Sequence, residues 1–316
     1  MSDAPPWVPP EYQLRQLLGS GQTSNVYLAA HAALGEVALK LPRPGLQDMP
    51  VLRRMFENEV QITLSMRHDH LVAGLAGSPT GPKAFLALEY CAGGTLDQLL
   101  LERGQLPLER ACDLISGVAS GLQQSHSQQV LHRDVKPANV FLTAWGTAKL
   151  GDFGTGSFMT EDNHERVGTA FYMAPEVFEG APASVASDVY SLGILSYEVL
   201  AGQRPFVGDT FDQLMLAHRT GLPKPLDFYR PGIDRMLVSV VSKAMSRERG
   251  RRYETVEQFR KAFDAAAGIT ARQAALAQAT GRAGRTVKPE DDPAKEATAP
   301  GTRRGPFSWF RRRGND

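Results

Sequence analysis

The sequence predicts an α+β fold, because strand patterns gather near its N-terminus and long helical patterns follow them. Strands are expected at residues 12–18, 25–30, 36–41 and 85–90. Helices are expected at residues 49–64, 108–128 and 187–200, with a further helix beginning near Thr95. A polar loop at residues 132–139, after the second of these helices, is the stretch around which the chain is organised.

Length and composition bound the function classes. The chain of 316 residues is long enough for one large or two moderate domains, and 42% hydrophobic residues suffice for a core. Its net charge of +1 neither favours nor excludes a charged partner. The two cysteines, Cys91 and Cys112, have no CxxC spacing, so we expect neither a disulfide framework nor a zinc site. This cysteine usage predicts a protein of the reducing cytoplasm.

No targeting segment is expected. Residues 1–10 contain four prolines and lack the basic and apolar regions of a signal peptide. The longest weakly charged stretch, residues 189–197, is too short to span a bilayer. We therefore expect a soluble, cytoplasmic protein.

The first two strands flank a turn at residues 19–24, which reads Gly-Ser-Gly-Gln-Thr-Ser. A Gly-x-Gly pattern has little specificity by itself. In a dinucleotide-binding fold the glycines would open a helix, whereas β-branched and aromatic residues follow here and favour a hairpin. A hairpin with small residues at its tip can lie over a triphosphate and donate backbone N–H groups to it.

The strand at residues 36–41 places Lys40 among apolar neighbours. An isolated lysine in such a strand is more often an exposed residue at a sheet edge. A lysine that served phosphates would need a carboxylate to hold it. The helix at residues 49–64 offers two candidates, Glu57 and Glu59.

The polar loop reads His-Arg-Asp-Val-Lys-Pro-Ala-Asn. It lies between two apolar runs, residues 130–131 and 140–142, so we expect a rigid loop held between two buried strands. Asp134 can accept the proton of a hydroxyl, Lys136 can lie against a transferring phosphate, and Asn139 can bind a hard cation through oxygen. These residue types suit phosphoryl transfer.

An Asp-Phe-Gly motif at residues 152–154 supplies Asp152 as a second metal ligand. Together with the polar loop, it resembles, position for position, the catalytic loop and Asp-Phe-Gly motif of the eukaryotic-type (Hanks-type) serine/threonine protein kinases. The resemblance covers roughly residues 11–265, and the short loops look bacterial. It implies a bilobal protein-kinase fold, with a small β-rich N-lobe (about residues 11–90) and a larger α-helical C-lobe (about residues 95–265).

The resemblance implies an enzyme that transfers the γ-phosphate of ATP to serine and threonine hydroxyls of protein substrates, itself included, in a signalling role. Asp134 orients the hydroxyl, and Lys136 neutralises phosphate charge. Asn139 and Asp152 hold Mg²⁺, with Mn²⁺ as the alternative metal. The expected catalytic residues are Lys40, Glu59, Asp134 and Lys136.

The implied ATP site lies between the lobes. Lys40 contacts the α and β phosphates, and Glu59 holds it, because the spacing from Glu59 to the next segment matches the family. Glu57 is then a solvated neighbour. Backbone groups of Glu89 and Cys91 bond the adenine edge. The expected nucleotide contacts are Leu18, Gly19, Ser20, Gly21, Gln22, Thr23, Ser24, Asn25, Val26, Lys40, Glu89 and Cys91.

The chain departs from the family pattern at the tip of the hairpin and in the loop that follows the Asp-Phe-Gly motif. Ser24 replaces the third glycine of the hairpin; it is small, so we expect a modest effect on nucleotide affinity. Arg133 would pair with a phosphate on the following loop, yet residues 161–165 of that loop read Glu-Asp-Asn-His-Glu. We hypothesise that these acids partly replace a phosphate, with Thr160 as the best remaining phosphorylation site.

Further supporting contacts are implied for the C-lobe. Thr169, in the stretch Gly-Thr-Ala-Phe-Tyr-Met-Ala-Pro-Glu at residues 168–176, should bond near Asp134 and Lys136. Glu176, at the end of that stretch, should form a buried ion pair with Arg252. In the same way His132 should pack and hydrogen-bond rather than react, and Asp188 should cap its helix and brace the polar loop.

Two rival functions stay open. A pseudokinase would use the same fold as a binding module or scaffold. A small-molecule phosphotransferase would share the catalytic loop but would not need residues 168–176, which build a peptide-binding shelf in the family. Among protein substrates, Thr95 and Ala138 stand where arginine-directed members carry acids, so we expect no strong demand for basic residues before the phosphorylation site.

The C-terminal residues 266–316 form a tail rich in Ala, Gly, Pro and Arg, and we expect this tail, like the leader at residues 1–10, to be disordered. Residues 303–316 place three aromatic residues between two basic clusters. They read either as part of a solvated tail or as a site for an anionic membrane or a docking partner, which would make the protein peripheral at the membrane. Nucleic-acid binding is the least favoured option.

Overall fold

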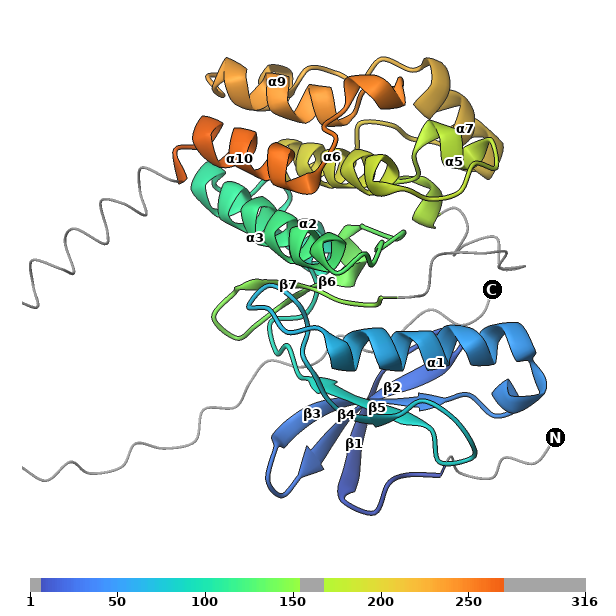
Figure 1. Ribbon diagram of the computed structural model, residues 1–316. Coiled ribbons are helices and arrows are strands. Elements are labelled where there is room, and N and C mark those ends of the chain that lie inside the picture. Colours follow the sequence, from blue (N-terminus) through green and yellow to red (C-terminus); the bar gives the residue numbers. More distant parts are fainter. Residues whose placement is uncertain (1–6, 154–167, 270–316) are drawn as a thin grey trace, which may run out of the picture. The chain divides into compact units, whose positions relative to one another are not determined.

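The structure is a computed structural model that describes residues 7–153 and 168–269 (Figure 1). Some expectations fall outside these residues. They concern the leader up to residue 6, Gly154, Thr160, residues 161–165 and the tail beyond residue 269.

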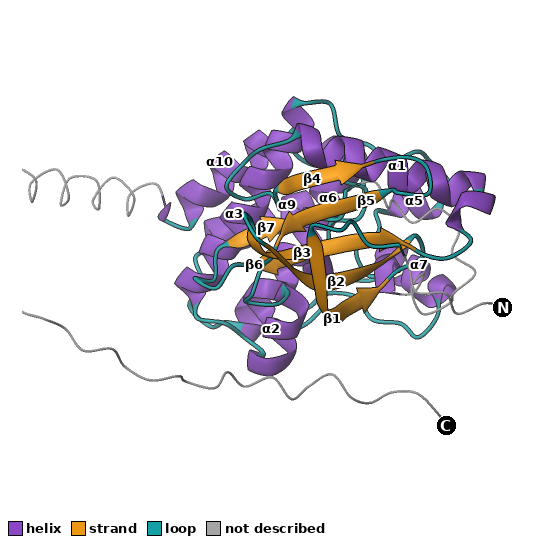
Figure 2. Ribbon diagram, turned by 90° about the horizontal axis from the view of Figure 1, so that it is seen from below, coloured by secondary structure: helices purple, strands orange, loops and turns teal. Residues whose placement is uncertain are grey.

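The N-terminal part of the chain forms a five-stranded antiparallel sheet with the order β1-β2-β3-β5-β4 (Figure 2). Its strands are β1 (Tyr12–Ser20), β2 (Ser24–His31), β3 (Gly35–Pro42), β4 (Gly74–Ser78) and β5 (Phe85–Glu89). β1 and β2 extend farther than expected and leave only residues 21–23 in the turn between them. β4 was not expected, because its sequence Gly-Leu-Ala-Gly-Ser has few residues of high strand propensity.

α1 (Pro50–Ser65) is the helix of this lobe, and it packs on β4 (Figure 1). Pro50 occupies the first turn, where a missing backbone N–H costs no helical hydrogen bond. The buried residues of α1 have the spacing of one helical face: they are Phe56, Glu59, Val60 and Thr63. Glu59 is therefore an acid placed among apolar positions, and it needs a partner inside the fold.

The C-terminal part is mainly helical. Its helices are α2 (Leu96–Arg103), α3 (Leu108–Ser127), α5 (Pro175–Phe178), α6 (Val185–Ala201), α7 (Phe211–Thr220), α8 (Leu226–Tyr229), α9 (Arg235–Ala244) and α10 (Val256–Ala266). Short 3₁₀ turns lie at η2 (Pro137–Asn139) and η3 (Arg249–Arg251) in this part, whereas η1 (Leu46–Asp48) precedes α1 in the N-terminal part. Within the described residues, no helix combines the length and apolarity needed to cross a membrane. The expected α+β fold, a β-rich N-lobe and a helical C-lobe, is confirmed.

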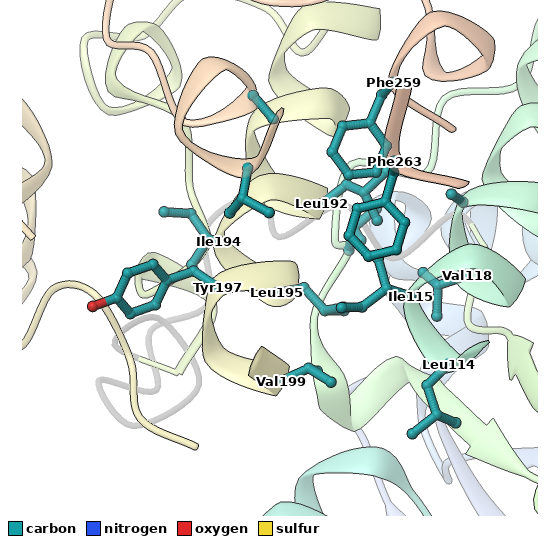
Figure 3. Packing of buried hydrophobic residues seen from close by; sticks show 14 of the residues in the cluster. Leu114, Ile115, Val118, Leu192, Ile194, Leu195, Tyr197, Val199, Phe259 and Phe263 are labelled. Atoms are coloured by element: carbon teal, nitrogen blue, oxygen red, sulfur yellow. The ribbon is translucent and has the colours of Figure 1, made fainter. Parts of the chain in front are cut away.

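α6 is the centre of the C-lobe core. Every residue from Ser187 to Ala201 is buried, as expected of a helix enclosed on all sides. α3, α9 and α10 pack around it. Figure 3 shows Phe259 and Phe263 of α10 meeting Leu192 of α6 and Ile115 of α3. This core fixes the helices from which the polar loop and its supports project.

A small two-stranded sheet, β6 (Val140–Leu142) and β7 (Ala148–Leu150), follows the polar loop. The strand expected before the loop is absent, so the expectation for residues 130–131 is wrong. The reason is that the chain is still leaving α3 there. Gln129 has a left-handed φ of 60°, and the Val130 N–H donates to the Ser125 carbonyl over 3.0 Å, which closes the helix end.

The segment between α1 and β4 is anchored to the C-lobe by backbone hydrogen bonds. The Val72 N–H donates to the Leu150 carbonyl at 3.0 Å, and the Leu150 N–H donates to the His70 carbonyl at 2.9 Å. His70 Nδ1 lies 2.8 Å from the Ala148 carbonyl oxygen. Gly121 of α3 permits this approach, because a Cβ there would lie 2.3 Å from the His70 carbonyl oxygen. The sheet that carries Lys40 is thereby tied to the strand that precedes Asp152.

Candidate active site

Lys40, Glu59 and Asp152 meet in one buried cluster of charges. The Lys40 ammonium, on β3, contacts the Glu59 carboxylate of α1, and its Nζ atom lies 2.9 Å from Oδ1 of Asp152. Burial by itself would lower the pKa of Lys40, but Asp152 and Glu59 outweigh it and hold that pKa above its ordinary value. The alternative partner, Glu57, pairs with Arg53 instead, with Oε1 and Nε 3.6 Å apart.

Two carboxylates face one ammonium in this cluster, so it has an excess of negative charge when all three groups are ionised. Burial raises the pKa of Glu59 to about 7, against the opposing effect of Lys40. Burial also opposes ionisation of Asp152, but Lys40 holds the pKa of that carboxyl below its ordinary value. A cation bound at Asp152 would offset the excess charge.

The polar loop brings Asp134, Lys136 and Asn139 together. Lys136 Nζ lies 2.8 Å from Oδ2 of Asp134 and 2.9 Å from the Thr169 hydroxyl. Asn139 donates from Nδ2 to the Asp134 carbonyl at 2.8 Å and to Oδ2 of Asp134 at 3.0 Å. The second carboxylate oxygen of Asp134, Oδ1, is buried and has no hydrogen-bond partner in the part of the chain that the structure describes. The described residues thus leave the hydrogen-bonding capacity of this acceptor unused.

The residues that could hold a divalent cation are oxygen donors. The Asn139 amide uses its NH₂ group on Asp134, which leaves its carbonyl oxygen as the ligand atom, and Asp152 offers a carboxylate. Residues 7–153 and 168–269 hold no group of three or more His, Cys, Asp or Glu side chains that could bind a metal. Mg²⁺ is commonly held by only one or two protein carboxylates, together with substrate phosphates and water. Asp152 and Asn139 therefore fit Mg²⁺ that binds together with a nucleotide.

Asp188 of α6 fixes the backbone of the polar loop. Its Oδ2 and Oδ1 atoms accept hydrogen bonds from the N–H groups of His132 and Arg133, both at 2.9 Å. Arg133 has a left-handed φ of 70°, which these bonds hold in place. The expectation that Asp188 caps α6 is wrong, because Ser184 does so: its side chain accepts from the Ser187 N–H at 3.3 Å. Asp188 lies one turn farther in, where its carboxylate reaches the loop.

His132 is fully buried and supports the Asp-Phe-Gly segment. Its Nε2 atom lies 2.9 Å from the Gly151 carbonyl oxygen, and its ring meets the Phe153 ring edge-on, with centroids 4.7 Å apart. Burial lowers the pKa of His132, which favours the neutral ring. The histidine thus links the polar loop to the strand end that carries Asp152.

The hairpin between β1 and β2 is held down at its tip. The Gly21 N–H donates to the Ser24 carbonyl at 2.8 Å, and the Arg43 N–H donates to the Thr23 carbonyl at 3.0 Å. A Cβ at Gly19 would meet nothing within 4 Å, and one at Gly21 would meet only the Ser24 carbonyl oxygen, at 3.7 Å. The protein itself therefore leaves open space beside both glycines, as a loop that approaches phosphates requires. Ser24 is buried.

Glu89 and Cys91 lie where β5 leads into α2. The Glu89 N–H donates to the Ala73 carbonyl at 2.9 Å, and its side chain pairs with Lys149 at 3.0 Å. Burial raises the pKa of the Cys91 thiol to about 12, so the thiol stays protonated and unreactive. A Cβ at Gly93 would lie 2.5 Å from the Thr143 carbonyl oxygen, so only glycine fits there. The linker is thus tightly packed against the C-lobe.

The described part of the segment after Gly168 is anchored to the C-lobe. Arg252 donates from both of its terminal nitrogens to Glu176, each at 2.7 Å, which is the ion pair expected from the sequence. The same guanidinium also donates to the Ala186 carbonyl at 2.9 Å. Arg252 is almost fully buried, so the pair is a desolvated brace rather than a surface contact.

Comparison with protein-family models matches residues 12–258 to the protein kinase domain. The chain belongs to the protein kinase family. The chain is 33% identical over 266 residues to "Serine/threonine-protein kinase PknB" of Mycobacterium leprae, and the matched region covers 81% of this chain and 43% of that protein. It is 34% identical over 260 residues to the protein of the same name from Mycobacterium tuberculosis (79% and 42%). "Serine/threonine-protein kinases PknA" of Corynebacterium glutamicum is 34% identical over 253 residues (77% and 53%).

The chain spans about half the length, or less, of these relatives. The family expected from the polar loop and the Asp-Phe-Gly motif is confirmed. The relatives named above come from actinobacteria, in line with the bacterial character expected of the kinase domain.

Some contacts of the kinase site were not expected from the sequence. His126, near the end of α3, places Nε2 2.8 Å from Oδ2 of Asp188 and so adds a third contact to that carboxylate. A histidine at a helix C-terminus ordinarily reads as a favourable interaction with the helix dipole, so the pattern gave no reason to look for this contact. Arg204 and Glu198, close to residues 168–176, were also missed.

Proposed function

We propose that this protein is an ATP-dependent serine/threonine protein kinase, whose catalytic domain extends over about residues 11–265. The observation that carries the proposal is the buried Oδ1 of Asp134, which has no hydrogen-bond partner among residues 7–153 and 168–269. Its carboxylate pairs with Lys136 and lies on the same loop as Asn139. Such an acceptor suits a hydroxyl that must be oriented and relieved of its proton. The relatives' names support serine and threonine as the acceptor residues.

In this proposal, Oδ1 of Asp134 accepts a hydrogen bond from the substrate hydroxyl, while Asn139 and Lys136 hold Oδ2 of the same aspartate in place. Lys136 spreads positive charge toward the transferring phosphate, and its contact with Thr169 fixes its direction. Lys40, oriented by Glu59, contacts the phosphates that stay behind. Asp152 and Asn139 hold Mg²⁺, which neutralises charge on the phosphates when bound. The chain's contribution is mainly positioning and charge stabilisation.

The nucleotide contacts are proposed at the hairpin residues 18–26, at Lys40, and at the backbone of Glu89 and Cys91. Open space beside Gly19 and Gly21 supports the hairpin's part in this. The Glu89 N–H already donates to Ala73, so the carbonyl of Glu89 is the group left for an adenine amino group. Burial of Ser24 supports the expectation that this serine keeps the hairpin close.

The experiment that tests the activity is transfer of labelled γ-phosphate from ATP with Mg²⁺, to the chain itself and to a generic basic protein, followed by phosphoamino-acid analysis. We expect phosphoserine or phosphothreonine, and loss of transfer when EDTA removes the metal. Phosphotyrosine, or label found only on small molecules, would contradict the proposal. ATP binding without any transfer would favour the scaffold reading.

For residues 303–316 we propose contact with an anionic membrane surface or a docking partner, supported only by their sequence of aromatics between arginines. Co-sedimentation of the full chain with vesicles containing phosphatidylserine tests the membrane case. Deletion of residues 303–316 should reduce the bound fraction. Equal binding by the full and shortened chains would leave these residues as a solvated segment.

A further inference from the structure

Glu198, near the end of α6, is a buried carboxylate close to the segment that follows Thr169. It accepts a hydrogen bond from the Tyr172 hydroxyl, and its Oε1 lies 3.2 Å from Nε of Arg204. Burial raises the pKa of Glu198 above its ordinary value, against the effects of Tyr172 and Arg204. A carboxylate in this position has a strong need for a cation or a donor.

Arg204 supplies this cation to Glu198 from the solvent-facing side. Its guanidinium centre lies 4.0 Å from the centroid of the Phe171 ring and 5.9 Å from that of Tyr172. The guanidinium is thus held by a carboxylate and by aromatic faces, the two kinds of group that bind this cation best. The Arg204 side chain is 39% exposed, whereas that of Glu198 is 12% exposed. Arg204 therefore covers the acid on its solvent side.

This pair lies beside the proposed catalytic loop. Phe171 and Tyr172 lie two and three positions after Thr169, and the Thr169 hydroxyl lies 2.9 Å from Nζ of Lys136, which contacts Asp134. The Ser191 hydroxyl of α6 donates to the Tyr172 carbonyl at 2.7 Å and fixes this stretch of chain. Residues 169–172 connect the contact with Lys136 to the contact with Arg204, so a peptide that lies along this stretch passes Arg204.

We propose that Arg204 is a specificity-determining residue, because its guanidinium occupies, within the chain, the position against Glu198 and Phe171 that a basic side chain of a substrate would otherwise take. The inference rests on the proposed protein kinase function. With Arg204 present, Glu198 already has a cationic partner, and the partly exposed guanidinium disfavours a basic residue at one substrate position. Without it, Glu198, Tyr172 and Phe171 form a subsite for arginine.

At Thr95 and Ala138, the acids that would attract arginine are missing. Beside Phe171 an acid, Glu198, is present, and Arg204 of the same chain blocks it. The competing interpretation is that Arg204 only satisfies a buried carboxylate. In that case its loss would reduce stability and leave substrate selection unchanged.

The test compares the wild-type chain with Arg204→Met, which keeps most of the side-chain stem and removes the guanidinium. Substrates are a serine peptide with alanine around the phosphorylation site, and a series that carries one arginine at each successive upstream position. We expect Arg204→Met to raise the ratio of kcat/KM between one arginine peptide and the alanine peptide by about 10- to 100-fold. Glu198→Gln added to Arg204→Met should cancel the gain.

Arg219→Met is the matched control, because Arg219 also pairs with a glutamate, Glu179, at 3.2 Å, but both side chains are more than half exposed. It removes one positive charge and should leave every peptide ratio unchanged. Arg204→Gln is the second variant if Arg204→Met folds poorly, since the glutamine amide can still donate to Glu198. It should shift the ratio in the same direction.

A readout without catalysis separates this inference from the proposed function. Fluorescence anisotropy measures binding of a labelled arginine peptide that lacks a hydroxyl. Tighter binding by Arg204→Met than by the wild type, lost again with Glu198→Gln, supports the inference even in a chain that transfers no phosphate. Unchanged peptide ratios and unchanged binding in folded Arg204 variants, or a gain that persists without Glu198, would overturn it.

Discussion

At the scale of single residues, the site depends on which of two nearby acids on α1, Glu57 or Glu59, lies on the buried face of the helix. Glu59 and Glu57 are two positions apart on α1, so they project from different sides of the helix. Glu59 shares the buried face with Val60 and reaches Lys40, whereas Glu57 pairs with Arg53. Helical spacing relative to the apolar positions is a signal that the sequence does carry, and it favours Glu59.

The two acids give a matched pair of variants. Glu59→Gln should lower kcat/KM by a factor on the order of 10², because Lys40 loses the carboxylate that holds it toward the phosphates. Glu57→Gln should keep kcat/KM near the wild-type value, since the ion pair of Glu57 with Arg53 is long, at 3.6 Å, and only half-buried. Steady-state kinetics with varied ATP measure both. Equal losses in the two variants would show that α1 contributes through its overall fold and not through the Lys40 pair.

A second residue-scale prediction concerns His218 of α7. This histidine is fully buried, with Nδ1 2.7 Å from the Tyr190 hydroxyl and its ring 4.7 Å from that of Phe206, centroid to centroid. Burial lowers the pKa of His218 to about 4. Between pH 6.5 and 4 the unfolded chain therefore binds a proton that the folded chain refuses. The stability this group contributes is complete above pH 6.5 and is lost as the pH falls toward 4.

The variant His218→Gln should lose less stability on acidification than the wild type. Between pH 7.5 and pH 5 we expect the two losses in the free energy of unfolding to differ by about 2 kcal/mol. Urea unfolding at both pH values measures the difference, and other buried histidines such as His132 cancel because both chains contain them. Parallel decreases in the two chains would mean that His218 is protonated within the fold.

At the scale of elements, hydrophobic periodicity locates most of the structure, but it does not say which polar residue ends an element. The helix from residue 187 was expected to begin with Asp188 as its cap. α6 instead begins earlier, with Ser184 as the cap, and this places Asp188 inside the helix and against the polar loop. An acid near a helix start suits both roles, so only the tertiary contacts decide.

Substitutions of Ser184 and Asp188 should therefore have opposite effects on stability and turnover. Ser184→Ala should cost about 1 kcal/mol of unfolding free energy, as loss of a cap does, and leave kcat nearly unchanged. Asp188→Asn should lower kcat strongly, because one of the two oxygens that accept from His132 and Arg133 becomes an NH₂ group. Thermal unfolding and steady-state kinetics on the same preparations check this. A Ser184→Ala chain with impaired turnover and full stability would reverse the assignment.

The misread strand at residues 130–131 has a related cause. Two apolar residues before a polar loop fit a buried strand, and they fit equally well the exit from a helix. The left-handed residue there is Gln129, not a glycine or an asparagine, so the sequence carries no local signal for the turn. β4 was missed for the opposite reason: its two glycines and its alanine have low strand propensity, and the surrounding sheet determines the strand.

At the scale of the whole molecule, the proposed site joins groups that are far apart in the sequence. Lys40 and Asp152 are separated by 112 positions, and Glu176 and Arg252 by 76. The family pattern predicts such pairs, because a match to the family implies its fold and therefore which distant residues lie close together. Pairs outside that pattern, such as Arg204 with Glu198, need the coordinates, because they depend on how the end of α6 lies beside residues 171–172.

The bonds between His70, Val72 and the β7 region give the molecule a fixed link between its sheet and its helices. Through that link, the strand that carries Lys40 and the loop that carries Asp134 belong to one framework. We propose that Asp134, held in this framework with one acceptor oxygen that no described residue binds, serves phosphoryl transfer to a hydroxyl.

The most direct measurement is the rate of γ-phosphate transfer from ATP with Mg²⁺ to a serine- and threonine-containing protein, for the wild type, Asp134→Asn and the exposed control Asp209→Asn. We predict that Asp134→Asn lowers the rate by a factor on the order of 10² to 10³ or more, with ATP affinity retained, because an amide cannot accept the hydroxyl proton. Asp209→Asn should match the wild type. Equal rates for wild type and Asp134→Asn, or no transfer by a wild type that binds ATP, would contradict the claim.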